Sequence, residues 1–156
     1  VLAIKLLYDR YKNDKKTELV VICGSNKWLY KQLHGRYPGK ITAVRFTDKM
    51  AAYMRMADVF VTKPGGLSTT EGAVLGVPMV HIMSIPGCET RNMRFFAQYG
   101  MSVPVKRIGM GLPNATDRLL SRAEAEKVTE NQRKYINSAA AADICRLAEK
   151  LINNGL

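Results

Sequence analysis

The sequence predicts an α/β fold in which a parallel sheet is flanked by helices. Short, continuous apolar runs, of the kind buried on both faces of a parallel sheet, alternate with longer segments of helical periodicity. Glycine and proline stand at many of the boundaries between these segments. The chain has 156 residues, of which 47% are hydrophobic, so we expect residues 1–156 to form a single domain with a sizeable core.

The first half of the chain is expected to contain three helices and three strands. A helix over about 2–13 precedes the apolar run ELVVIC, which predicts a strand over 18–23. Gly24, Ser25 and Asn26 then turn the chain into a helix that carries Trp28 and ends near residue 37. A strand over 41–46 follows. Asp48 is expected to cap a helix over about 50–57, which leads into a strand over 58–62.

The second half is expected to continue the alternation and then to loosen. Helices are predicted over 67–75 and 91–99, and strands over 79–83 and 102–105. Gly109, Gly111 and Pro113 predict a loop, after which helices over 121–135 and 139–152 close the chain. Strands separated by helices imply right-handed parallel crossovers, with ligands beyond the carboxyl ends of the strands. The loops at 24–26, 46–49, 63–68 and 84–92 should therefore open on one edge.

The charge of the chain is strongly positive and unevenly placed. There are 24 basic and 13 acidic residues, a net charge of +11, and the stretch 19–47 holds five cations and no acid. Such a stretch favours a phosphorylated ligand, an anionic lipid or a nucleic acid, and a solvated lysine-rich surface is an equally open interpretation. With 8% aromatic residues and no recognised nucleic-acid motif, we expect no nucleic-acid partner.

Cysteine and histidine usage points to a reducing compartment without a metal site. Three widely spaced cysteines suggest no disulfide framework, and two histidines are too few for a histidine-rich metal site. No apolar run has the length of a membrane span. We therefore expect a cytoplasmic protein, with a peripheral position on the inner face of the membrane as an option.

The motif KPGGLSTTE, Lys63–Glu71, is the strongest candidate site. A strand ends there, Gly65 and Gly66 allow close backbone approach, and a helix begins near Ser68. The N–H groups at the start of a helix and the helix dipole suit a diphosphate, to which Ser68 and Thr69 can add hydroxyl donors.

Glu71 has two open interpretations. It lies one turn into the helix and can accept hydrogen bonds from ribose hydroxyls. Alternatively, Ser68-x-x-Glu71 matches a capping box, in which Glu71 satisfies the backbone N–H of Ser68 and the two glycines serve only the turn.

The motif PGCETRN at 86–92 is the second candidate. Glu89 and Asn92 can hydrogen-bond a sugar, and Arg91 can meet a phosphate. A helix start with a capping glutamate explains the same spacing.

Four stretches together resemble the C-terminal, donor-binding domain of GT-B glycosyltransferases. They are FTDKM at 46–50, ADVFVTKPGGLSTTE at 57–71, GVPMV at 76–80 and PGCETRN at 86–92. The resemblance is to the monogalactosyldiacylglycerol synthase and diacylglycerol glucosyltransferase type, and more distantly to the peptidoglycan-precursor GlcNAc transferase. It covers about 18–100 and implies a Rossmann-like parallel sheet flanked by helices, the C-terminal half of a GT-B fold, with its first strand missing.

The family binds a UDP-sugar in this domain, so the resemblance implies roles for the matching residues. The backbone at Phe46 and Thr47 is expected at the uracil edge, and Glu71 at the ribose hydroxyls. Residues 24–26 are expected to face the nucleotide. The diphosphate is expected on the loop and helix start formed by Gly65, Gly66, Leu67 and Ser68.

The resemblance also places the sugar and marks one departure. Glu89 and Asn92 fall in the loop that contacts the donor sugar, and Lys63 or Arg91 can supplement the diphosphate contacts. Cys88 stands where the family often has glutamine, and a thiol cannot make the paired hydrogen bonds of an amide.

The implied activity is an inverting transfer of a hexose from a UDP-sugar to a lipid acceptor such as diacylglycerol, without a metal or a cofactor. The acceptor groove and the catalytic base are expected in an amino-terminal domain that is missing here, so no catalytic residue is assigned in this chain. We expect a fragment or one half of a split enzyme, with an anionic membrane surface as an additional partner. A non-catalytic donor-binding subunit and a UDP-sugar epimerase-like protein are the alternatives.

Overall fold

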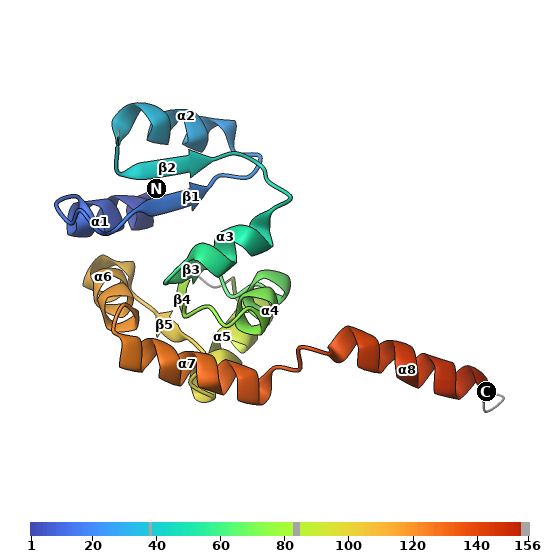
Figure 1. Ribbon diagram of the computed structural model, residues 1–156. Coiled ribbons are helices and arrows are strands. Elements are labelled where there is room, and N and C mark those ends of the chain that lie inside the picture. Colours follow the sequence, from blue (N-terminus) through green and yellow to red (C-terminus); the bar gives the residue numbers. More distant parts are fainter. Residues whose placement is uncertain (38, 83–84, 154–156) are drawn as a thin grey trace.

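The computed structural model describes residues 1–37, 39–82 and 85–153. Helices and strands alternate over most of this part of the chain (Figure 1). The helices are α1 (Leu2–Tyr11), α2 (Lys27–Arg36), α3 (Met50–Met56), α4 (Gly66–Val74), α5 (Cys88–Gln98), α6 (Ile108–Leu119), α7 (Arg122–Tyr135) and α8 (Ala140–Asn153). The strands are β1 (Leu19–Ile22), β2 (Ile41–Val44), β3 (Phe60–Thr62), β4 (Met79–Ile82) and β5 (Val103–Val105). The predicted end of the fourth strand, at 83, lies outside the described residues.

Every strand pair in the described part of the chain is parallel, which confirms the predicted α/β class. β1 pairs with β2, with Leu19 opposite Ile41, and β4 lies between β3 and β5. The strands nevertheless form two sheets, β1–β2 and β3–β4–β5, so β1 and β3 each pair on one side only within the described residues. In a doubly wound sheet the first strand lies between the second and the fourth. A strand ahead of α1 would therefore belong where these two sheets part.

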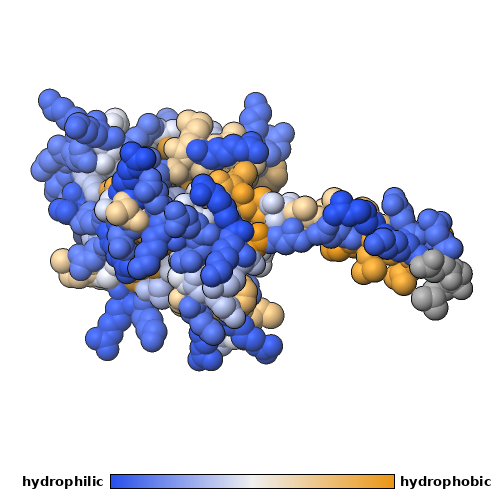
Figure 2. All heavy atoms as spheres, turned by 60° about the horizontal axis from the view of Figure 1, so that its bottom comes forward, coloured by the Kyte–Doolittle hydropathy of each residue, from blue (hydrophilic) through white to orange (hydrophobic). Residues whose placement is uncertain are grey.

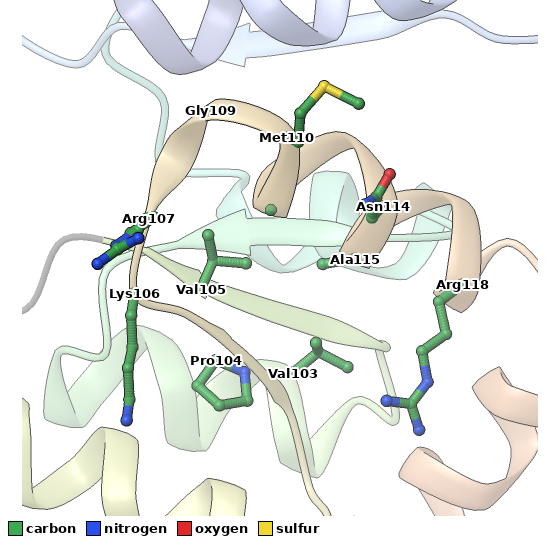
Figure 3. A pocket seen from close by; sticks show the side chains of 11 residues that line it. Val103, Pro104, Val105, Lys106, Arg107, Gly109, Met110, Asn114, Ala115 and Arg118 are labelled. Carbon is green, nitrogen blue, oxygen red and sulfur yellow. The ribbon is translucent and has the colours of Figure 1, made fainter.

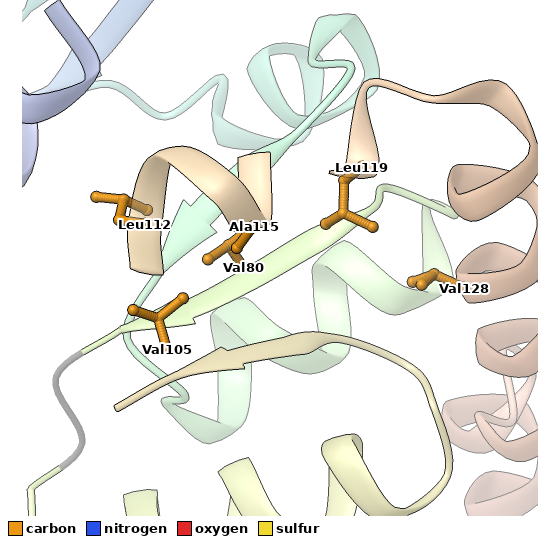
Figure 4. Close-up of a cluster of buried hydrophobic side chains, with 6 residues drawn as sticks. All are labelled: Val80, Val105, Leu112, Ala115, Leu119 and Val128. Carbon is orange, nitrogen blue, oxygen red and sulfur yellow. The ribbon is translucent and has the colours of Figure 1, made fainter. Parts of the chain in front are cut away.

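The larger core lies between the β3–β4–β5 sheet and the helices α6 and α7. Its buried side chains point toward one another from β4, β5, α6 and α7 (Figure 4), and they are Val80, Val105, Leu112, Ala115, Leu119 and Val128. Half-buried side chains of α1 and β3 pack against them. The core thus joins the amino-terminal helix to the second sheet.

Helix α6 replaces the loop that was predicted around 109–113, and that prediction was wrong. The helix bends at Gly109, where φ is −29° and ψ is −110°, and then continues through Pro113. Pro113 is tolerated because it is among the first four residues after the bend, whose N–H groups have no partner within the helix. Gly111 lets α6 approach β5 closely, since a Cβ there would lie 3.3 Å from Val105 Cγ1.

A second core lies on the other side of the sheet, where α4, α5 and β4 meet. Ala73, Met79, Phe96 and Met101 are buried there. The amide nitrogen of Gln132, on α7, donates hydrogen bonds to the backbone carbonyls of Val77 (2.9 Å) and Met101 (3.0 Å).

Helix α1 is fastened to α6 by a polar cluster. The Asp117 carboxylate accepts a hydrogen bond of 2.7 Å from the Tyr11 hydroxyl and one of 2.9 Å from Arg10 Nε. The Tyr11 hydroxyl also lies 2.9 Å from Thr116 Oγ1. Because α1 leads directly into β1, this cluster ties the β1–β2 sheet to the rest of the domain.

Helix α8 projects away from the body of the molecule (Figure 1). None of its 14 residues is buried. Its apolar side chains gather along one side (Figure 2), because Ile144, Leu147, Leu151 and Ile152 recur at helical spacing. Neither α8 nor any other helix of the described residues combines the length and apolar composition that a membrane span requires.

Candidate donor-binding site

The turn between β3 and α4 leaves a helix start open. Gly65 precedes the helix, and the first bond within the helix runs from the Thr69 N–H to the Gly65 carbonyl (3.1 Å). The N–H groups of Gly66, Leu67 and Ser68 therefore have no partner within the helix, and no side chain of the described residues caps them. No acidic side chain occupies the first turn. Such a start attracts an anion through its N–H groups and the helix dipole.

The paired glycines are not required by the turn itself. Neither Gly65 nor Gly66 has a positive φ, and the φ of Gly65 is −70°. A Cβ on Gly65 would meet nothing within 4 Å, and one on Gly66 would meet only Asn92 Nδ2, at 4.0 Å. Because Gly65 and Gly66 have no side chains, they leave open space beside the uncapped start of α4.

The capping-box interpretation of Ser68 and Glu71 is wrong. Helix α4 begins at Gly66, so Ser68 is its third residue rather than the residue before it. The Glu71 carboxylate is exposed and has no hydrogen bond or ion pair within the described residues. It lies one turn after the open N–H groups and is available to a ligand.

Leu67 and Thr69 point in opposite directions. The Leu67 side chain is 81% exposed, whereas Thr69 is fully buried. The Thr69 hydroxyl has no hydrogen-bond partner in the described part of the chain, and the Thr69 N–H is already bonded within the helix. The expectation that Thr69 donates to a phosphate therefore does not fit its burial, and Ser68 is the better placed hydroxyl.

The second predicted loop meets the first one directly. Helix α5 begins at Cys88, three residues earlier than predicted, and Gly87 precedes it with a φ of 106°. Asn92 donates from Nδ2 to the Pro64 carbonyl (3.0 Å), and Glu89 Oε1 lies 3.4 Å from Lys63 Nζ. These contacts hold the start of α5 against the turn that opens α4.

Glu89 also has a structural role at the start of α5, as its spacing in the sequence allowed. Its Oε2 accepts a hydrogen bond of 2.7 Å from the backbone N–H of Ile85, just ahead of the helix. The Cys88 thiol and the Arg91 side chain are exposed beside it. The Lys63 ammonium is partly neutralised by Glu89, and the described residues place no acid against Arg91.

The loop after β1 is formed by Gly24, Ser25 and Asn26, and its residues differ in exposure and in hydrogen bonding. Gly24 has a positive φ of 56°, Ser25 is exposed, and the Asn26 side chain caps α2 by accepting from the Leu29 N–H (2.9 Å). Asn26 is therefore largely committed to the helix. This cap was not predicted, although asparagine just before a helical segment is a recognisable signal for it.

Phe46 and Thr47 follow the end of β2. The Phe46 side chain is 80% exposed, and Thr47 Oγ1 accepts from the Lys49 N–H (3.0 Å). Helix α3 is preceded by Lys49 and has no side-chain cap, so the predicted Asp48 cap was wrong. No hydrogen bond or ion pair between described residues links the loops after β1 and β2 to those after β3 and β4.

A hollow of about 800 Å³ lies elsewhere, along β5 and the bend in α6 (Figure 3). Val103, Val105 and Ala115 form part of an apolar floor, and the cations Lys106, Arg107 and Arg118 stand around it. None of the predicted site residues lines it. This hollow was not predicted, because it depends on α6, the helix that replaced the predicted loop.

Comparisons with known proteins find relatives in both sequence and fold. The chain is 28% identical to the processive diacylglycerol beta-glucosyltransferase of Bacillus pumilus (strain SAFR-032), over 97% of this chain and 41% of that protein. The crystal structure of Acinetobacter baumannii MurG superposes with a TM-score of 0.71 at 21% identity, over 97% of this chain and 47% of that chain. The glycotransferase of kitacinnamycin gives a TM-score of 0.72 at 22% identity, over 94% and 39%.

The chain therefore spans about two-fifths of the length of the curated relative that it matches. The two solved structures share its fold, which agrees with the resemblance drawn from the four sequence stretches. The glycosyltransferase family 28 C-terminal domain matches residues 4–147, nearly the whole chain. The chain belongs to the C-terminal domains of glycosyltransferase family 28.

Proposed function

We propose that this chain is the donor-binding half of an inverting hexosyltransferase, which transfers a hexose from a UDP-sugar to a lipid such as diacylglycerol. The observation that carries the proposal is the uncapped start of α4, with open space at Gly65 and a Glu71 carboxylate that no described residue pairs with. The family membership and the diacylglycerol glucosyltransferase relative support the reaction class.

The proposed mechanism assigns the leaving group to α4. An acceptor hydroxyl oxygen attacks the anomeric carbon of the sugar, the bond from that carbon to the phosphate oxygen breaks, and UDP leaves with the electron pair. The N–H groups of Gly66, Leu67 and Ser68 stabilise the charge that develops on the diphosphate. The proton of the acceptor hydroxyl passes to a catalytic base. No residue of this chain is assigned that role, and we expect the base in another part of the enzyme.

The remaining residues are proposed to position the donor. Glu71 accepts hydrogen bonds from the ribose hydroxyls, and the backbone at Phe46 and Thr47 meets the uracil. Glu89 and Asn92 face the sugar from the start of α5. Because the named relative transfers glucose, UDP-glucose is the first donor to test.

The test is a calorimetric titration of the chain with UDP, UDP-glucose, UDP-galactose and UDP-GlcNAc. Replacing Glu71 with alanine is expected to weaken UDP binding by about tenfold or more, because it removes hydrogen bonds to a charged acceptor. The unfolding midpoint should stay unchanged, since Glu71 has no partner among the described residues.

Glu130→Ala is the matched control, because Glu130 is also an exposed helical glutamate, on α7. It should bind UDP as the parent chain does. If Glu71→Ala and Glu130→Ala bind UDP equally well, the ribose role of Glu71 is wrong. If the parent chain binds no uridine nucleotide, the donor-binding proposal itself fails.

A further inference from the structure

We propose that the outward face of α2, formed by Lys27, Trp28, Lys31, Gln32 and Gly35, docks on a membrane rich in anionic phospholipid. Helical spacing places these five residues on one side, and all of them are exposed. The opposite side of α2 packs on the domain through buried Leu33 and half-buried Leu29 and Tyr30. The face is therefore free of any role in the core.

No ion pair between described residues neutralises the charge on this face. All six ion pairs of the described residues lie outside 19–47. Of the five cations in that acid-free stretch, Lys40 is occupied, because its ammonium donates to the carbonyls of Asp14 and Thr17. The Arg45 guanidinium lies over the Tyr30 ring, 5.7 Å from its centroid, on the packed side of α2. Lys27, Lys31 and Arg36 remain for an anionic surface.

Trp28 gives the face an apolar anchor. Its side chain is 59% exposed and lies on the same side of the helix as Lys27 and Lys31. Tryptophan is favoured at membrane interfaces, where its ring enters the headgroup region while lysines meet the lipid phosphates. A cationic face with one large aromatic side chain thus complements an anionic bilayer in both charge and polarity.

The choice of a membrane over a nucleic acid rests on the proposed function, whose acceptor is a lipid. A docking face on the donor-binding half would hold the bound UDP-sugar close to the bilayer that contains this acceptor. The lysines on this face are expected to recognise the net negative charge of the lipid headgroups.

Trp28 is the only tryptophan of the chain, so its fluorescence reports this face alone. Vesicles of phosphatidylglycerol mixed with phosphatidylcholine are expected to shift its emission to the blue, and brominated lipid in the same vesicles should quench it. Pure phosphatidylcholine vesicles should do neither, and raised salt should reverse the shift. Binding without any change in Trp28 emission would overturn the assignment to this face.

A pair of matched double variants separates this face from the net charge. Lys27→Gln with Lys31→Gln should weaken binding to anionic vesicles by roughly thirtyfold, since each cation near such a surface is worth a factor of about five. Lys127→Gln with Lys134→Gln removes the same charge from exposed positions on α7 and should change binding less than threefold. Equal losses in the two variants would overturn the proposal.

Two further measurements keep this inference distinct from the proposed function. Duplex DNA that shifts Trp28 emission when anionic vesicles do not would overturn the choice of lipid. UDP titration of the α2 double variant should match the parent chain, because the face lies outside the donor contacts. Vesicle docking without UDP binding would support this face while rejecting the donor-binding proposal, and UDP binding without docking would do the reverse.

Discussion

At the scale of single residues, the glycines of this chain serve different purposes. Gly72 is required by packing, because a Cβ there would lie 2.9 Å from Met79 Sδ and 3.4 Å from Phe60 Cδ1. Gly66 is required by neither packing nor backbone conformation. The lack of a side chain at Gly66 therefore matters for a ligand that approaches the start of α4 from solvent.

Replacing Gly66 with alanine is expected to separate binding from stability. The free energy of unfolding should stay within about 1 kcal/mol of the parent value, because alanine is accepted in a helix. UDP affinity should fall by roughly tenfold, as the new methyl group occupies the diphosphate approach. Gly72→Ala is the contrasting variant, with an expected loss of about 1–3 kcal/mol from overpacking. Unchanged UDP affinity in Gly66→Ala would contradict the proposed contact.

His81 makes the stability of the domain sensitive to acid. The ring lies fully buried on β4, 3.0 Å from Ser102 Oγ through Nδ1 and edge-on to Phe96. Burial lowers the pKa of His81 from 6.5 to about 4. Between these pH values the unfolded chain binds more protons than the folded one, so acid favours unfolding.

Urea unfolding at pH 7 and pH 5 tests this effect. His81 should account for about 2 kcal/mol of lost unfolding free energy over that interval. His81→Gln cannot take up the proton, so its stability should fall by correspondingly less between the same two pH values, whatever its stability at pH 7. Parallel pH dependence in both proteins would show that His81 titrates normally.

At the scale of elements, one carboxylate, Asp117, collects the polar contacts between α1 and α6, beside the apolar packing of Ala3 and Leu7. Partial burial would by itself raise the pKa of Asp117, but hydrogen bonds from Arg10 and Tyr11 and the charge of Arg10 together lower it. Burial, in turn, raises the pKa of Tyr11 to about 12, so its hydroxyl stays protonated and donates.

Tyr11→Phe is expected to destabilise the domain by about 2 kcal/mol, since it removes a hydrogen bond to a charged acceptor from a buried site. Arg10 would still pair with Asp117, so α1 should remain helical. Chemical denaturation measures the loss, and Tyr8→Phe provides a control tyrosine on the same helix. An equal loss in both variants would contradict the special role of Tyr11.

The elements that sequence predicted best are those with a continuous pattern. The apolar runs predicted the first four strands to within a few residues. Of the four loops expected on one edge of the sheet, those after β3 and β4 contact each other. Helix α6 was missed because Gly109, Gly111 and Pro113 are strong local breakers. Burial of Leu112, Ala115 and Leu119 against the sheet overrides them.

The candidate site was only partly predictable for a similar reason. Sequence located the glycine pair and Glu71, but capping signals misplaced the start of α4. The Ser-x-x-Glu pattern predicted that the helix begins near Ser68. In the structure Gly65 is the residue ahead of the helix, three positions earlier, and the pattern carries no information about that position. The contact from Asn92 to the Pro64 carbonyl joins residues 28 positions apart and has no local signal.

At the scale of the whole molecule, α8 contributes little to the folded body. A chain that ends at Asn137 should unfold within about 0.5 kcal/mol of the parent, because no residue of α8 is buried. A chain that ends at Tyr135 also loses Ile136, which packs against the second core, and should be measurably less stable. Denaturant midpoints of the two truncations decide the point. A large loss in the longer one would show that α8 supports the body.

The division into two sheets has a consequence for how this domain behaves on its own. The free sides of β1 and β3 carry backbone donors and acceptors without strand partners in the described part of the chain. Such edges are templates for another strand. A strand placed between β1 and β3 would join the two sheets into one continuous sheet and would pair both of these free edges. The gap between the two sheets is therefore where a longer polypeptide would complete the domain.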